Sequence, residues 1–194
     1  MNGNQQEEFI NQVRDKLVNA VLTSLAFFSL IQTSVLIYRQ TQLNDPSFYY
    51  QLFVQVIFLS VFIFSRFLRL EFKSWLLILV GLLASFIGLK TFALAGAAVM
   101  ALMTMVILSA FLLGLKQSIW VGIIAISVLA LYGYLVSIQQ IQYTIDFNLY
   151  LSSAVSWITV GVSFVYLIGV LLYVYRGFFT ELLLMNEKLN KLMA

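Results

Sequence analysis

Cysteine and histidine are both absent from the 194 residues of this chain. Without cysteine, the chain cannot form disulfides, act through a catalytic thiol or bind a metal through thiolates. Without histidine, it cannot ligate haem through an imidazole or use the side chain that most often serves as a general base. The sequence therefore predicts no catalytic residue, no metal site and no cofactor, and we do not expect an enzyme.

Charge is scarce as well. Charged residues make up 10% of the chain and hydrophobic residues 62%, and the mean hydropathy is +0.97. A soluble domain is about half apolar and a quarter charged, so the apolar excess has to face lipid. No charged residue falls in the middle of an apolar segment. Proton relays, ion-coupled transport and voltage sensing generally need such intramembrane groups, so these functions are not expected.

Six apolar segments are long enough to cross a bilayer, for which an α-helix needs about 20 residues. We expect tight turns at Lys90–Thr91 and at Lys116–Gln117. The predicted fold is all-α, with an amphipathic N-terminal helix at 1–16, a six-helix transmembrane bundle at 17–174 and the start of a cytoplasmic coiled-coil helix at 175–194. The predicted spans are Leu17–Tyr38, Phe48–Ser65, Ser74–Leu89, Phe92–Leu115, Ser118–Val136 and Leu149–Val174.

Lysine and arginine are distributed unevenly between the two sides of this bundle. With the N-terminus in the cytoplasm, nine of them fall on the inner side and two, Arg39 and Lys90, on the outer side. Cytoplasmic loops carry the excess of such residues, so we predict that both termini are cytoplasmic. The pI of 9.2 reflects these membrane-flanking residues, and we expect no nucleic-acid partner.

Small residues recur in the third and fourth spans. Ala93, Ala97 and Ala101 follow one another at intervals of four residues, and Gly81 and Gly88 lie in the preceding span. Small residues at this spacing let helix backbones approach closely. We interpret them as the packing surface of an antiparallel hairpin; the alternative is that they line a ligand cleft.

Uncharged polar side chains gather toward the outer ends of spans one, two, five and six. Gln51 and Gln55 are one helical turn apart and therefore share a face. Unpaired amides are costly in lipid, so these side chains should point into the bundle. They either form hydrogen bonds between helices or line a pocket between these four spans for a small neutral or lipid-like ligand. The candidate ligand-binding residues are Gln32, Gln51, Gln55, Tyr132, Ser156 and Trp157.

The last helix carries a heptad pattern as it leaves the membrane. Its large apolar residues alternate spacings of three and four, as at positions a and d of a two-stranded coiled coil. We interpret this pattern as the relay seam of a homodimer and expect an output domain to begin just after Ala194. The alternative is an amphipathic helix on the inner leaflet. The seam residues are Tyr175, Phe178, Leu182, Met185, Leu189 and Leu192.

The stretch from 69 to 135 resembles the N-terminal six-span sensory region of bacterial membrane-bound histidine kinases and diguanylate cyclases. It contains a basic loop, a span ending in Gly88-Leu89, the small-residue segment FALAG at 92–96 and the turn LLGLK at 112–116. The resemblance implies sensory input in a two-component-type receptor, homodimerisation, and a multi-pass location in the bacterial inner membrane. It implies no particular ligand or binding residue.

Three functions from different classes therefore stand before the structure is considered. The first is a sensory input module that binds a small neutral or amphiphilic ligand and relays it to a cytoplasmic output domain. The second is a small transporter or channel subunit, against which the uncharged spans argue. The third is a passive membrane anchor for a cytoplasmic partner, which any other bundle could replace.

Overall fold

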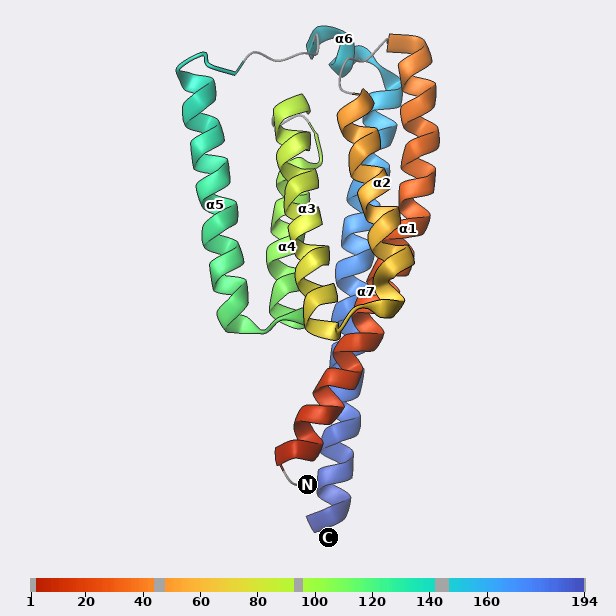
Figure 1. The fold of residues 1–194 in the computed structure, drawn as a ribbon, viewed down its shortest axis with the longest axis vertical. Helices are drawn as coiled ribbons and strands as arrows, with labels where there is room; N and C mark the ends of the chain where they lie inside the picture. Colours follow the sequence, from red (N-terminus) through yellow and green to blue (C-terminus); the bar gives the residue numbers. More distant parts are fainter. Residues whose placement is uncertain (1–2, 44–47, 93–95, 142–146, 194) are drawn as a thin grey trace.

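The computed structural model describes residues 3–43, 48–92, 96–141 and 147–193. All of its regular elements within these ranges are helices (Figure 1). They form one bundle, which confirms the all-α prediction for the part of the chain described. The elements are α1 (Gly3–Leu43), α2 (Phe48–Phe64), the short 3₁₀ helix η1 (Ser65–Phe67), α3 (Leu70–Phe92), α4 (Ala98–Leu112), α5 (Leu115–Ser137), α6 (Phe147–Ser152) and α7 (Ala154–Met193).

Five helices are long and apolar enough to cross a membrane, and a sixth, α4, is shorter. The five segments run over Ile10–Tyr38, Phe48–Phe67, Leu70–Phe92, Leu115–Ser137 and Ser156–Thr180. The described part of α4 has only 15 residues, fewer than the roughly 20 that span the hydrocarbon. The structure is thus that of a membrane protein with five candidate spans and one shorter apolar helix.

The third and fourth predicted spans differ most from the structure. We expected α3 to end before Lys90–Thr91, but both residues belong to its last turn. The Thr91 hydroxyl donates to the Ile87 carbonyl oxygen at 2.9 Å, and the Lys90 ammonium lies 5.4 Å from the ring centroid of Tyr50 on α2. A cation in the last turn also interacts favourably with the helix dipole. These contacts extend α3, and α4 begins correspondingly later.

The turn after α4 lies slightly before its predicted position. Gly114 has a φ of +99° and precedes the first residue of α5. This backbone conformation is open to glycine and strained for other residues. The expected turn residues Lys116 and Gln117 therefore belong to the first turn of α5.

The two longest helices, α1 with 41 residues and α7 with 40, pack against each other. Figure 1 shows the beginning of α1 and the end of α7 projecting from the same end of the bundle, which we call the exit end. Near this end, a Cβ atom added to Gly177 would lie 2.9 Å from Leu17 Cδ2. The N-terminal helix thus continues directly into the first span and lies beside the helix that ends the chain.

A buried lysine joins α1 to α3 near the exit end. Lys73 is 5% exposed, and its ammonium donates to Asp15 Oδ1 and to Asn19 Oδ1, at 2.9 Å in each case. Asn19 Nδ2 in turn donates to Asp15 Oδ2 at 3.1 Å. Burial of an ammonium group is costly unless it is paired and hydrogen-bonded. The basic segment between the second and third spans therefore contributes a cation to the interior of the bundle.

Helix α5 lies at one side of the bundle, next to α4 and away from α1, α2 and α7 (Figure 1). A small hydrophobic cluster joins it to α3 and α4. The main core lies mostly among the other helices, and α5 contributes Val121 to it. Glycines bring α3 and α4 together as predicted. A Cβ on Gly88 would lie 3.1 Å from the Ala98 Cβ, and one on Gly81 would collide with the Met105 side chain.

Replacing Gly88 by isoleucine should separate α3 from α4, because the short distance to Ala98 leaves no room for a branched side chain. We expect a loss of stability of about 1–3 kcal/mol, measured as a lower thermal unfolding midpoint of the purified protein in detergent. Gly133→Ile on α5 is the matched control, because nothing lies within 4 Å of a Cβ at that position. Equal destabilisation by both variants would contradict the close helix contact.

Candidate functional site

A cavity of about 220 Å³ lies among α1, α2, α3, α7 and the start of α4. It is in the half of the bundle opposite the exit end, because Gln51 and Gln55 of its lining lie in the first two turns of α2. Its described lining is mainly apolar and contains no Asp, Glu, Lys or Arg. A mostly apolar cavity with a few polar groups is typical of a site for a small molecule.

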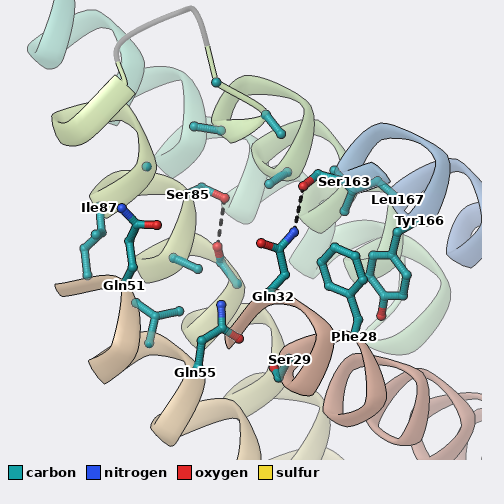
Figure 2. A pocket seen from close by; sticks show the side chains of 18 of the residues that line it. Phe28, Ser29, Gln32, Gln51, Gln55, Ser85, Ile87, Ser163, Tyr166 and Leu167 are labelled. Atoms are coloured by element: carbon teal, nitrogen blue, oxygen red, sulfur yellow. Dashed lines mark hydrogen bonds between the residues drawn. The ribbon is translucent and has the colours of Figure 1, made fainter. Parts of the chain in front are cut away.

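Three of the polar side chains that line this cavity are glutamines. Figure 2 shows Gln51 and Gln55 extending from α2 and Gln32 extending from α1. Gln32 Nε2 donates to the Ser163 hydroxyl on α7 at 3.0 Å, and that hydroxyl donates to the Thr159 carbonyl oxygen at 2.8 Å. A chain of hydrogen bonds therefore joins α1 to α7 at the wall of the cavity.

A pair of aromatic rings forms another part of this wall. Phe28 on α1 and Tyr166 on α7 stack with their centroids 3.9 Å apart and their planes 6° from parallel (Figure 2). The Tyr166 hydroxyl lies 3.2 Å from the Ser24 hydroxyl on α1, a hydrogen bond in which either oxygen can donate. Stacking and hydrogen bonding thus fix the contact between α1 and α7 beside the cavity.

The opposite wall is built from small residues of α3 and the start of α4. The small side chains at these positions leave the space that the cavity occupies, and the same residues pack the two helices together. That a ligand binds in this space stays a prediction, and Ala93 of the predicted series lies outside the described residues. The Ser85 hydroxyl donates to the Gly81 carbonyl oxygen at 2.8 Å, so this polar group is satisfied within its own helix. The small lining residues are Gly81, Ala84, Ser85, Gly88, Gly96, Ala97, Ala98 and Ala101.

The structure brings together Gln32, Gln51 and Gln55 but not the other three candidate residues. Tyr132 is 4% exposed within the cluster of α3, α4 and α5, because α5 packs on α4 and not beside α2. Ser156 is buried, and its hydroxyl lies outside the cavity lining. Trp157 is 63% exposed, and its indole Nε1 donates to the Leu151 carbonyl oxygen at 2.7 Å.

The sequence did not single out Ser163 and Tyr166, two polar α7 residues that line the cavity. Both follow Thr159 at helical spacing, since Thr159, Ser163 and Tyr166 are separated by four and three residues. These three polar residues lie on one face of an otherwise apolar helix, and this pattern in the sequence could have identified Ser163 and Tyr166 as cavity residues. Ser156, one turn before Val160, lies on the same helix but not in the lining.

The predicted relay seam is only partly covered by described side chains. Phe178 packs into the main core, with its ring 5.5 Å from that of Phe111 on α4. Phe178 thus contacts the core of its own bundle, and its place in a dimer seam stays a prediction. Tyr175 is exposed. The side chains of Leu182, Met185, Leu189 and Leu192 lie outside the described part, although the backbone there is helical.

Because the chain has no cysteine, single cysteine variants report directly on the cavity. Gln55→Cys should react with N-ethylmaleimide faster than Phe53→Cys, which lies on the same helix outside the lining and is 58% exposed. Thiols react as thiolates, which need water or polar neighbours. The amides of the cavity lining provide polar neighbours, whereas acyl chains do not. Intact-protein mass spectrometry of protein in lipid nanodiscs measures the two rates. Faster labelling at position 53 would show that the cavity is closed to polar molecules.

No protein-family model matches this chain, and no curated protein or solved structure matches it either. The function is therefore inferred from the geometry of the cavity and from the course of α1 and α7. The resemblance to the sensory regions of histidine kinases and diguanylate cyclases stays a prediction.

Proposed function

We propose that this chain is the membrane input module of a two-component-type receptor in the bacterial inner membrane. In this proposal, a small neutral or lipid-like molecule binds in the cavity, and α7 relays its presence to an output domain in the cytoplasm. One observation carries the proposal: Ser163, Tyr166 and Leu167 line the cavity, and the same helix continues without a break to Met193. A shift of α7 at the cavity has to move its far end.

Helix α1 provides the second half of the relay. It carries Phe28 and Gln32 at the cavity, and Val13 and Leu17 belong to the same hydrophobic core as Val174 near the exit end. A ligand shifts this helix pair only if it binds one arrangement of α1 and α7 more tightly than the other. The hydrogen bond from Gln32 to Ser163 and the stacked rings of Phe28 and Tyr166 join the two helices at the cavity. In this proposal they are the contacts that a bound ligand alters.

An exposed apolar stripe on α7 supports a homodimer. The residues Val165, Ile168, Leu172, Tyr175 and Phe179 alternate spacings of three and four, and all are at least 39% exposed. This is the a/d periodicity of two helices in a left-handed pair. In the proposed dimer contact, Phe179 takes the place predicted from the sequence for Phe178, because Phe178 packs against the core of its own bundle.

Oxidative cross-linking tests the dimer. Tyr175→Cys should form a disulfide between two copies under copper phenanthroline, because paired a/d positions bring Cα atoms within the distance of roughly 7 Å that a disulfide requires. Val174→Cys, buried in its own bundle at 0% exposure, and Phe53→Cys, which has the same 58% exposure as Tyr175 but lies on α2, should remain monomeric on non-reducing gels. Cross-linking of Phe53→Cys to the same extent would indicate random collisions and remove the support for the stripe.

Phase-shifted fusions test the relay itself. The chain is fused after Ala194 to the phosphoacceptor and kinase domains of a histidine kinase, and four or seven residues are inserted after Glu181. Seven residues restore the heptad phase and four do not, so autophosphorylation in membranes should change with the four-residue insertion and stay near the parent level with seven. Identical activity in all three fusions is the result expected of a passive anchor and would end the relay proposal.

A further inference from the structure

Gln55 presents an unpaired amide to the cavity. Gln55 is half-buried, lines the cavity, and makes no hydrogen bond within the described part of the chain. A primary amide has two N–H donors and a carbonyl acceptor. Leaving these groups unpaired in an apolar membrane interior costs free energy. The geometry therefore calls for a polar group in the cavity next to Gln55.

The carbonyl oxygen of Gln32 faces the same space from the neighbouring helix. Gln32 donates through Nε2 to Ser163, and within the described residues its Oε1 accepts no hydrogen bond. Figure 2 shows the amides of Gln32 and Gln55 extending from α1 and α2 toward the space between them. Gln32 therefore offers a hydrogen-bond acceptor, and Gln55 offers both donors and an acceptor. A group that both donates and accepts hydrogen bonds satisfies this pair.

The remainder of the lining excludes charge and favours an apolar body. No Asp, Glu, Lys or Arg lines the described part of the cavity, so an ionised ligand would lose its hydration without gaining a counter-charge. Phe28, the small residues of α3 and Leu167 offer apolar contacts. The cavity volume of about 220 Å³ suits a small molecule or a short chain.

We propose that the cavity binds a small uncharged amphiphile whose carboxamide or hydroxyl head lies between Gln55 and Gln32 and whose short apolar chain packs against Phe28 and the small residues of α3. The inference takes the input site of the proposed function as its location and adds the chemical class of the ligand. Binding is nevertheless independent of signalling, because it requires only the cavity of the bundle.

Equilibrium binding of two radiolabelled probes tests the proposal. Octanamide carries an uncharged head with donors and an acceptor, whereas octanoate has the same chain and is ionised at pH 8. With the full chain in nanodiscs, and with binding to empty nanodiscs subtracted, octanamide should bind saturably to one site per chain. Octanoate should show no saturable binding. Equal binding of both probes, or no saturable binding of octanamide, overturns the proposal.

Two variants test the role of the amide. Gln55→Met keeps the length of the side chain and removes every hydrogen-bonding group, so octanamide should bind about fivefold to tenfold more weakly. Gln140→Met is the matched control, because Gln140 is exposed after the end of α5 and far from the cavity lining, and its binding should equal that of the parent chain. Unchanged affinity of a folded Gln55→Met variant overturns the assignment of the head group. If that variant does not fold, the comparison of the two probes on the parent chain decides.

The result of the octanamide binding test can be distinguished from the result of the fusion experiment that tests the relay. Saturable octanamide binding without phase-dependent output in the fusions supports the ligand site and rejects the sensory role. Phase-dependent output without octanamide binding leaves the sensory proposal in place and rejects the ligand class.

Discussion

The absence of water from the hydrocarbon core of the membrane is the constraint on which the arrangement of this bundle depends. Each helix satisfies its own backbone, and short polar side chains can return a hydrogen bond to their own helix. Ser74, Ser85, Thr91 and Thr104 all donate to the carbonyl oxygen four residues earlier. These residues therefore need no partner on another helix, and they can be buried at closely packed contacts between helices.

Glutamine is the exception among these polar residues, because its amide extends beyond the backbone of its own helix. Gln32 reaches Ser163 on α7, while Gln55 lines open space. The cavity lies where glutamines on α1 and α2 face a wall of glycine, alanine and serine on α3. Long polar side chains on one side and very small ones on the other cannot fill the volume between them. This mismatch, and not a missing element, is the physical origin of the pocket.

The sequence predicts the helices and one half of the candidate site. Hydropathy located the apolar helices because lipid exposure dictates composition along their whole length, and the i, i+4 spacing of Gln51 and Gln55 placed both on one face of α2.

The sequence did not predict the end of α3, because Lys90 is held there by a ring on another helix. Tyr132, Ser156 and Trp157 were assigned from their depth in the membrane. Depth does not say toward which neighbour a side chain turns, and α5 has α4 as its principal neighbour. The heptad pattern likewise could not reveal that Phe111 already contacts Phe178.

The ion pair between buried Lys73 and partly exposed Asp15 restricts how α1 can move. Asp15 and Asn19 join α1 to α3 through Lys73. Ser24 and Gln32 lie about two turns or more further along the same helix and form hydrogen bonds with α7. Helix α1 is therefore attached to α3 near the exit end and to α7 beside the cavity. Because both attachments lie on one continuous helix, α1 cannot shift along its axis without straining the ion pair, the hydrogen bonds to α7, or both.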